Sequence, residues 1–354
     1  MQHTHKKRLV SIDTLKGFSV LFMIFIHIPM YLILIEEKTS FSYFILNTFA
    51  KISAPIFLFF VGFNLFLSIH NNKTPKKNIA KKSLYFFAIG LIFSLIWTPD
   101  IIHFIGFFML FLLLIARYNK KIKFFMALLV LIISPILLVF FDYASNWVSI
   151  PYVYNSIWTL SGFFKHLFVN GVYPFFPWVI FPLTGFVCGE MYIEHTTPMK
   201  KNQKRTKQMK VKENPQSLYY KNMLLFSLSL IIIALVVRML FNIPMTFYPA
   251  TQTYVLMALG VTIFSFALFF REYDMTNNKE KIFSFIGKNS FSFYILHVVI
   301  GIVPFMVLDL FNFFTFMGVM IYTIFVTGII ALICYYSGKK YGLGPIELLV
   351  KKLP

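Results

Sequence analysis

Long apolar runs alternate with short polar segments from one end of the chain to the other. Ten of these runs are long enough to be helices that cross a bilayer, a length that takes about 20 residues. They cover residues 13–35, 43–69, 80–98, 101–116, 123–141, 173–193, 222–242, 252–270, 283–308 and 315–337. The fourth is the shortest and follows a turn at residues 97–100. This pattern predicts an all-α integral membrane protein, a bundle of about ten transmembrane helices.

Composition supports the membrane prediction. Of the 354 residues, 58% are hydrophobic and 13% are charged, whereas soluble domains carry roughly 25% charged residues. The two cysteines, Cys188 and Cys334, both fall in apolar runs and form no metal or disulfide pattern. The formal net charge of +20 would suit a nucleic-acid-binding protein, so the positions of the basic residues decide between the two classes.

The basic residues concentrate on alternate loops. If the amino terminus is cytoplasmic, the inner segments hold 28 of the 33 Lys and Arg residues, and the outer loops hold only Lys38 and Lys165. Such asymmetry is the positive-inside signal, and it predicts that both termini are cytoplasmic. The excess charge then serves orientation and attraction to anionic lipid headgroups, so nucleic acid is not an expected partner.

The segment 196–221 is polar, rich in lysine and without apolar period. We interpret it as a flexible cytoplasmic linker inside a single domain of residues 1–354, with spans one to six at 13–193 and spans seven to ten at 222–337. A solvated inner loop is the simpler interpretation of its charge, and a landing surface for a polyanionic cofactor is the functional alternative.

The longest predicted outer loop, residues 142–172, is rich in aromatic residues, among them Trp158. Aromatic side chains commonly anchor a protein at the membrane interface. A stacking platform for sugar rings is the functional alternative.

Ionisable side chains inside spans are costly, so each is a candidate functional residue. Asp13, Lys16 and His27 share the first span. Lys16 and His27 are eleven residues apart, which places them on one helix face about 16 Å apart along the axis. We therefore expect Lys16 near the cytoplasm and His27 deep in the bilayer, where it is the leading candidate for a catalytic residue.

Other polar residues in or near the spans are further candidates. They are Lys51 in the second span, Asp100 and His103 at the outer mouth of the fourth, and Lys288, Asn289 and His297 in the ninth. His297 is expected at a depth similar to that of His27. The alternatives are structural, since a membrane histidine can join helices by hydrogen bonds and a lysine can extend to the interface.

Several strings resemble the heparan-alpha-glucosaminide N-acetyltransferase family, in particular its prokaryotic branch within the transmembrane acyltransferase superfamily. RLVSIDTLKGFSVLFMIFIH (8–27) is similar to the family's opening. SAPIFLFFVGF (53–63), DIIHFIG (100–106), YPFFPWVIFPLTGFVCG (173–189), YPATQTYVLMALG (248–260), FIGKNSFSFYILH (285–297) and GPIELLVKK (344–352) follow in the expected order. Together they cover nearly the whole chain.

The sequence also departs from the family pattern. Lys16 stands where the superfamily carries an arginine, and a lysine lacks the planar fork that binds phosphate with two hydrogen bonds. The histidine that the lysosomal enzymes are thought to use in the segment entering their next span has no counterpart between His27 and His70. That role is therefore not transferred to this chain.

The resemblance implies an acyltransferase of the plasma membrane that moves an acyl group, most simply acetyl, from cytoplasmic acyl-CoA to a hydroxyl or amine. The implied acceptor is a glycan or lipid-linked sugar, and no metal is required. We assign catalysis to His27, His297 and Lys51, and acetyl-CoA binding to Asp13, Lys16, Lys288 and Asn289. Acceptor binding is assigned to Asp100, His103, Trp158, Tyr173 and Trp178.

Two further interpretations concern function and assembly. A membrane transporter with a relay of His, Asp and Lys is the competing function, although no inverted repeat is evident between residues 1–195 and 222–354. Membrane lipids are expected partners, and a homodimer is compatible with the sequence.

Overall fold

The computed structural model describes residues 10–71, 75–97, 100–141, 143, 147–148, 153–154, 159–196, 215–276 and 282–352. The chain divides into two compact units. Unit 1 consists of Met1–Phe57 and Leu268–Leu353, and unit 2 consists of Leu58–Ala267. Two helices, α3 (Ser53–His70) and α11 (Gln252–Thr276), contribute residues to both units.

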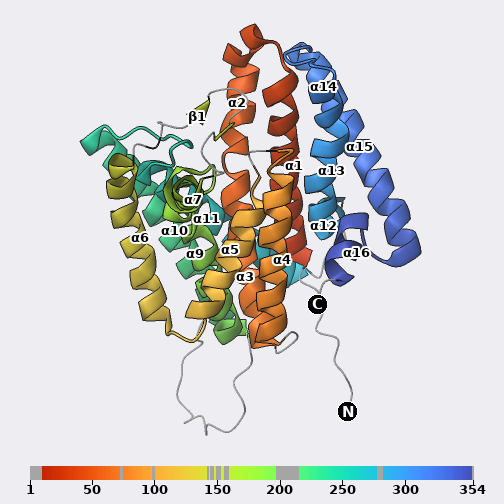
Figure 1. Cartoon of the computed structure of the whole chain (residues 1–354). Coiled ribbons are helices and arrows are strands. Elements are labelled where there is room, and N and C mark those ends of the chain that lie inside the picture. Colours follow the sequence, from red (N-terminus) through yellow and green to blue (C-terminus); the bar gives the residue numbers. More distant parts are fainter. Residues whose placement is uncertain are drawn as a thin grey trace, which may run out of the picture. The chain divides into compact units, whose positions relative to one another are not determined.

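Unit 1 joins the two ends of the sequence. Its helices are α1 (Val10–Leu32), the 3-10 turn η1 (Ile35–Thr39), α2 (Phe41–Ala50), α12 (Ile282–Lys288), α13 (Ser290–Gly301), α14 (Val303–Val307), α15 (Phe316–Tyr341) and α16 (Pro345–Lys352). Helix α1 packs against α2, α12, α13 and α15, so the first helix of the chain is surrounded by helices from its last quarter (Figure 1).

Unit 2 is built from the middle of the chain. Its helices are α4 (Lys76–Phe93), α5 (Ile102–Ile115), α6 (Lys120–Phe140), α7 (Leu160–Lys165), the π-helical turn η2 (His166–Asn170), α8 (Phe175–Trp178), α9 (Ile180–Thr196) and α10 (Pro215–Phe241). Two strands of two residues each, β1 (Trp147–Val148) and β2 (Val153–Tyr154), pair antiparallel. Helices α4 and α5 pack along each other, and α9 packs against α5, α6 and α10.

The predicted all-α membrane architecture is confirmed. Eight helical segments of the described chain are long and apolar enough to cross a membrane, and they coincide with eight of the ten predicted spans. The other two predicted spans are also helices. Helix α4 carries four lysines along its first two turns, and α5 has only 14 residues, so neither reaches the length and apolarity of the other eight. The protein is therefore a multi-pass membrane protein.

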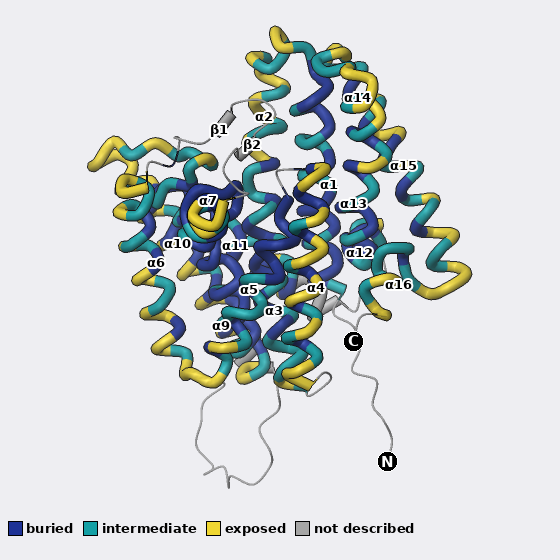
Figure 2. The backbone as a smooth tube through the Cα atoms, in the orientation of Figure 1, coloured by how far each residue is buried: buried dark blue, intermediate teal, exposed yellow. Residues whose placement is uncertain are grey.

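Exposed positions run along the outer helices (Figure 2), and many of them carry large apolar side chains. On α10, Leu225, Ile232 and Met239 are exposed, and on α15 the same holds for Ile321 and Phe325. Exposed apolar patches of this extent are rare in soluble monomers. In a membrane protein, they are the surface that contacts lipid, because helices satisfy their backbone groups internally and can present apolar side chains outward.

Glycines allow the closest helix contacts. In unit 1, α1 and α12 cross at Gly17 and Gly287, where a Cβ on Gly287 would lie 1.7 Å from the Asp13 carbonyl oxygen. In unit 2, a Cβ on Gly62 would lie 1.8 Å from the carbonyl oxygen of Pro182. Backbones that approach this closely exclude any side chain, and small residues at such crossings are typical of helix packing in membranes.

Two predicted elements differ in detail from the structure. The second part of the predicted outer loop 142–172 folds into α7 and η2, because the Thr159 side chain accepts a hydrogen bond from Gly162 N and starts a helix there. The predicted ninth span is divided into α12, α13 and α14, with breaks at Asn289 and Ile302. The second break comes just before Pro304 in the first turn of α14, which has no N–H to continue the hydrogen bonding of α13, whereas no proline accompanies the break at Asn289.

Candidate functional site

Two histidines meet in unit 1. Nδ1 of His27 on α1 lies 3.1 Å from Nε2 of His297 on α13, and the two ring centroids are 5.3 Å apart. His297 is fully buried, and His27 is half-buried. The structure therefore brings together two residues that the sequence separates by 270 positions and that we predicted to share a depth.

The backbone fixes the tautomers of this pair. Nδ1 of His297 lies 3.1 Å from the carbonyl oxygen of Phe293, which can only accept, so this nitrogen carries a proton. In the neutral ring, Nε2 of His297 then holds the lone pair, and His27 donates to it from Nδ1. His27 is left with its own lone pair on Nε2, which is the arrangement of an oriented general base.

Helices α1 and α13 run in the same direction from the glycine crossing to the histidine pair. Gly17 and Gly287 touch at one level, and His27 and His297 touch ten residues further along each chain segment. Ten residues of α-helix advance about 15 Å. The pair therefore lies about 15 Å from the glycine crossing along α1.

The predicted cofactor residues gather at that crossing. Asp13 is buried on α1, and its carbonyl oxygen faces Gly287, the residue before Lys288. Lys16, one residue before Gly17, is half-buried, as is Lys288 at the end of α12. The structure thus places two lysines from distant parts of the sequence in the two helices that cross here.

Asn289 has a structural task at the break between α12 and α13. Its side-chain nitrogen donates to the carbonyl oxygen of Phe285 over 2.9 Å, and it is 3% exposed. The start of α13 is further held by Glu347 of α16, whose carboxylate accepts from the backbone nitrogens of Phe291 (2.8 Å) and Ser292 (3.1 Å). The Ser292 hydroxyl also donates to Glu347 and accepts from Ile346 N. This contact was not predicted from the sequence, where the available signal was a glutamate in a short segment rich in lysine.

Lys51, the third predicted catalytic residue, lies where α2 ends, near the level of Ser19 on α1. It is the C-cap of α2, two residues before Ser53. Ser53 and Ser19 exchange hydrogen bonds, with each hydroxyl donating to the other residue's carbonyl oxygen over 2.6–2.7 Å. Ser19 precedes His27 by eight residues, about 12 Å along α1.

The predicted acceptor residues lie in unit 2. Asp100 and His103 are hydrogen-bonded to each other and are 0% and 1% exposed. Tyr173 and Trp178 pack edge to face with ring centroids 4.8 Å apart, and they are 5% and 1% exposed. Trp158 lies outside the described residues. Instead of an open platform, the structure shows these aromatic rings packed into the interior of the unit.

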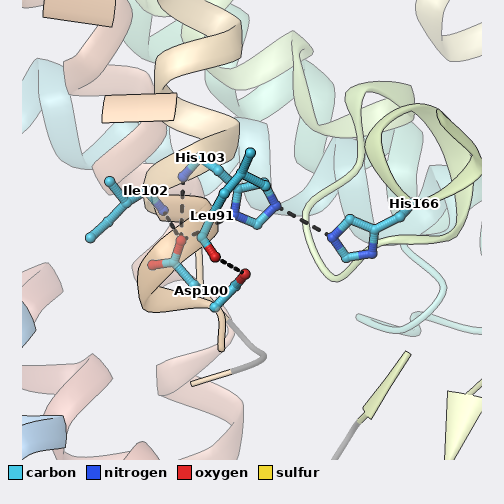
Figure 3. Close-up of polar contacts among 6 residues, drawn as sticks. Leu91, Asp100, Ile102, His103 and His166 are labelled. Carbon is cyan, nitrogen blue, oxygen red and sulfur yellow. Dashed lines mark hydrogen bonds and ion pairs between the residues drawn. The ribbon is translucent and has the colours of Figure 1, made fainter. Parts of the chain in front are cut away.

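His166 is the polar residue of unit 2 that sequence reasoning missed. Its Nε2 lies 3.3 Å from Nε2 of His103, and its side chain is 3% exposed (Figure 3). A buried role was not predicted for His166, because this residue lies in the predicted outer loop 142–172. The apolar residues around it, FFKHLFV (163–169), were the available signal of burial.

Comparison with known protein families matches two parts of the chain. Residues 8–220 match the family described as heparan-alpha-glucosaminide N-acetyltransferase, catalytic. Residues 205–354 match a family described as a protein of unknown function (DUF418). No curated protein matches the chain significantly. The first match spans more than half of the sequence, including α1 with His27 and the whole Asp100–His103–His166 cluster. The chain therefore belongs to the heparan-alpha-glucosaminide N-acetyltransferase catalytic family.

Proposed function

We propose that this protein is an acyl-CoA-dependent acetyltransferase of the plasma membrane. It takes an acetyl group from cytoplasmic acetyl-CoA and transfers it to a hydroxyl or amine of a glycan or lipid-linked sugar. Family membership supports acetyl transfer. The observation that carries the assignment of the base is the hydrogen bond between His27 and His297, since it leaves a lone pair on Nε2 of His27.

In the proposed reaction, Nε2 of His27 removes the proton from the acceptor as its oxygen or nitrogen attacks the thioester carbonyl. The C–O or C–N bond forms, the C–S bond breaks, and the leaving thiolate takes the proton back from His27. His297 stabilises the transient imidazolium of His27 by accepting its Nδ1–H, and the Phe293 carbonyl keeps His297 in the required tautomer. The reaction needs no net proton.

Acetyl-CoA is proposed to approach from the end of unit 1 where α1 and α12 cross. Lys16 and Lys288 would hold its phosphates as point charges, and the buried Asp13 would help to position Lys16. Asn289 supports this site through the α12–α13 break. The pantetheine arm would then extend along α1, past the level of Lys51, toward His27. An arm of this kind has to span about 15 Å, the advance of the ten residues between Gly17 and His27.

We propose that polar and aromatic residues of unit 2 bind the acceptor. Asp100 and His103 offer hydrogen bonds, and Tyr173, Trp178 and Trp158 offer aromatic faces, a combination that suits a sugar. Because Asp100, His103, Tyr173 and Trp178 are buried, a sugar reaches them only when unit 2 opens locally.

The test is a transfer assay with purified protein in lipid nanodiscs, using radiolabelled acetyl-CoA and a panel of lipid-linked sugars and glycans. The expected result is label in an acceptor with wild-type protein and none with His27→Ala. Binding of acetyl-CoA is measured separately by thermal shift. Binding without transfer to any acceptor in the panel directs the search to other acceptors, whereas the absence of acetyl-CoA binding would refute the proposal.

A further inference from the structure

Unit 2 contains a second group of buried polar residues, in which three side chains are hydrogen-bonded one after another (Figure 3). Oδ2 of Asp100 lies 3.1 Å from Nδ1 of His103, and Nε2 of His103 lies 3.3 Å from Nε2 of His166. The three residues are 0%, 1% and 3% exposed. Asp100 precedes α5, His103 lies in its first turn, and His166 begins η2.

Backbone groups at the Asp100 end determine which atoms donate and which accept in this series. Oδ2 of Asp100 accepts from Ile102 N over 2.9 Å and from His103 N over 3.3 Å. Backbone N–H groups can only donate, so this oxygen is an acceptor and the imidazole nitrogen facing it is a donor. With Nδ1 of His103 protonated, its Nε2 holds the lone pair in the neutral ring, and His166 donates to it from Nε2.

The three side chains are hydrogen-bonded one after another, and their polar atoms do not converge on a common site. His103 uses one ring nitrogen for Asp100 and the other for His166, so its two nitrogens point to different partners (Figure 3). A metal site needs donor atoms that converge, and among the described residues no group of three or more His, Cys, Asp or Glu is arranged in that way. A series of this kind is suited to passing a proton.

Tight packing holds the two rings in place. The Phe104 ring lies 4.0 Å from the His103 ring and 5.3 Å from the His166 ring, between centroids. A Cβ on Gly171 would lie 2.4 Å from the carbonyl oxygen of His166 and 3.3 Å from Cε1 of its ring. The rings are therefore fixed at hydrogen-bonding distance, which proton transfer requires.

Among the residues that the structure describes, few other titratable groups lie near these three side chains. Tyr173 interacts electrostatically with Asp100, and its side chain is hydrogen-bonded to Tyr248. Tyr143 donates to the carbonyl oxygen of Gly171 over 2.9 Å. Lys165 is adjacent to His166 in sequence and half-buried. The neighbours are mainly phenols, so Asp100 is the counter-charge that a proton on the histidines would meet.

We propose that Asp100, His103 and His166 form a proton relay inside unit 2. A proton arriving at Nδ1 of His166 lets that ring release its Nε2 proton to Nε2 of His103. His103 then becomes an imidazolium, stabilised by the Asp100 carboxylate. Loss of the proton by the same route restores the starting tautomers. Only N–H bonds form and break, and one proton enters for each one that leaves.

The relay predicts that protonation of the two rings is linked. In Asp100→Asn, the side-chain oxygen can still accept from Ile102 N, His103 N and Nδ1 of His103, which all meet one oxygen of Asp100, so the neutral tautomers are kept. The imidazolium of His103 loses its counter-charge, so the protonated form of the pair becomes less stable. The ¹⁵N chemical shifts of the ring nitrogens, recorded in nanodiscs, distinguish protonated from unprotonated sites and are the measurement.

The expected result is that both rings stay neutral to lower pH than in the wild type. A change confined to His103, or none, would overturn the relay and leave a static hydrogen-bonded strut. His195, whose Nδ1 lies 2.7 Å from the carbonyl oxygen of Met191 on an exposed part of α9, serves as the internal reference. Its signals should not change.

A pH titration of the wild-type protein decides the question if Asp100→Asn does not fold. In a relay, the ring signals of His103 and His166 change protonation together, because one proton is shared between them. Separate transitions would contradict the proposal.

A last arm tests whether the relay has a function in acetyl transfer. His166→Gln keeps a side chain that can donate to Nε2 of His103, but it cannot pass a proton between its two polar atoms, and His166 is not among the residues assigned to the acceptor. We expect transfer to fall about 10²–10⁴-fold with acetyl-CoA binding unchanged. A normal rate would restrict the relay to a structural role and overturn its functional assignment. If wild-type protein transfers no acetyl group at all, the proposed function fails, whereas the ¹⁵N measurement still judges the relay.

Discussion

His27 and His297 hold each other in one tautomeric arrangement across 3.1 Å. The cause lies one helical turn away, where the Phe293 carbonyl accepts from Nδ1 of His297. The two residues are therefore not equivalent. His27 carries the lone pair on Nε2, and His297 orients it, as an aspartate orients the histidine of a catalytic triad.

This asymmetry predicts different effects of two substitutions. His27→Ala removes the base, so acetyl transfer should fall by about 10²–10⁴-fold while acetyl-CoA binding and monodisperse yield stay near normal. His297→Asn keeps a side-chain acceptor for His27, and it should reduce transfer less. Single-turnover rates with labelled acetyl-CoA provide the measurement. Retained turnover in His27→Ala together with loss in His297→Asn would move the base to α13.

Lys16 is expected to act on the cofactor and not on the chemistry. Lys16→Ala should weaken acetyl-CoA binding, and Lys16→Arg should preserve it, because a phosphate needs a cation with hydrogen-bond donors. Titration of the thermal shift with acetyl-CoA measures both variants. Lys165→Ala, on the side of the bundle predicted to face outward, is the control. Normal binding by Lys16→Ala would show that the cofactor approaches elsewhere.

The crossing of α1 and α12 should tolerate no added methyl group. In Gly287→Ala, the new Cβ would meet the Asp13 carbonyl oxygen at 1.7 Å, and overpacking of this kind typically costs about 1–3 kcal/mol. The expected result is a lower unfolding temperature in detergent. Gly328→Ala on α15 is the matched control, because a Cβ there has nothing within 4 Å. Equal stability of the two variants would contradict the described packing of α1 on α12.

Glu347 is expected to be a positioning residue for the helix that carries His297. Its carboxylate accepts two backbone N–H groups at the start of α13 and the Ser292 hydroxyl. Hydrogen bonds to charged groups are worth about 1.5–3 kcal/mol each, so Glu347→Gln should lower both stability and the transfer rate. Glu194→Gln, which breaks the exposed ion pair with Lys120, is the control and should be nearly silent.

Two observations would separate positioning from a general loss of fold. The transfer rate of Glu347→Gln should remain low at temperatures far below its unfolding transition, and the ¹⁵N signals of His297 should shift. If the rate recovers fully on cooling and the His297 signals match the wild type, Glu347 only stabilises α16.

The distribution of basic residues predicts the orientation of the chain. Residues 196–221 should face the cytoplasm and residues 142–172 the outside. Single cysteines at positions 206 and 155, introduced into a variant without Cys188 and Cys334, can be labelled with a reagent that does not cross the membrane. Labelling of position 155 but not 206 from outside is expected, and the opposite pattern would invert the topology.

The sequence by itself determined the class of the protein and the positions of its helices. A bilayer demands long apolar segments with internal hydrogen bonding, so the ten apolar runs had one reasonable interpretation, and their helices lie where the pattern placed them. The depth of His27 and His297 followed from the same reasoning, because helical rise is constant. Ordered strings across the chain also indicated the family.

Only the tertiary structure decided which helices meet. An apolar helix face does not identify the helix that packs against it, because lipid and neighbouring helices are equally apolar. The pairing therefore came from local contacts with no sequence period, such as Gly17 on Gly287. The direction of the hydrogen bond between the two histidines depended on the Phe293 carbonyl, and the link from His103 to His166 depended on a turn that the sequence presented as a loop. Hydrogen bonds between residues far apart in the chain leave no mark on one sequence, and they decide which ring nitrogen holds the lone pair.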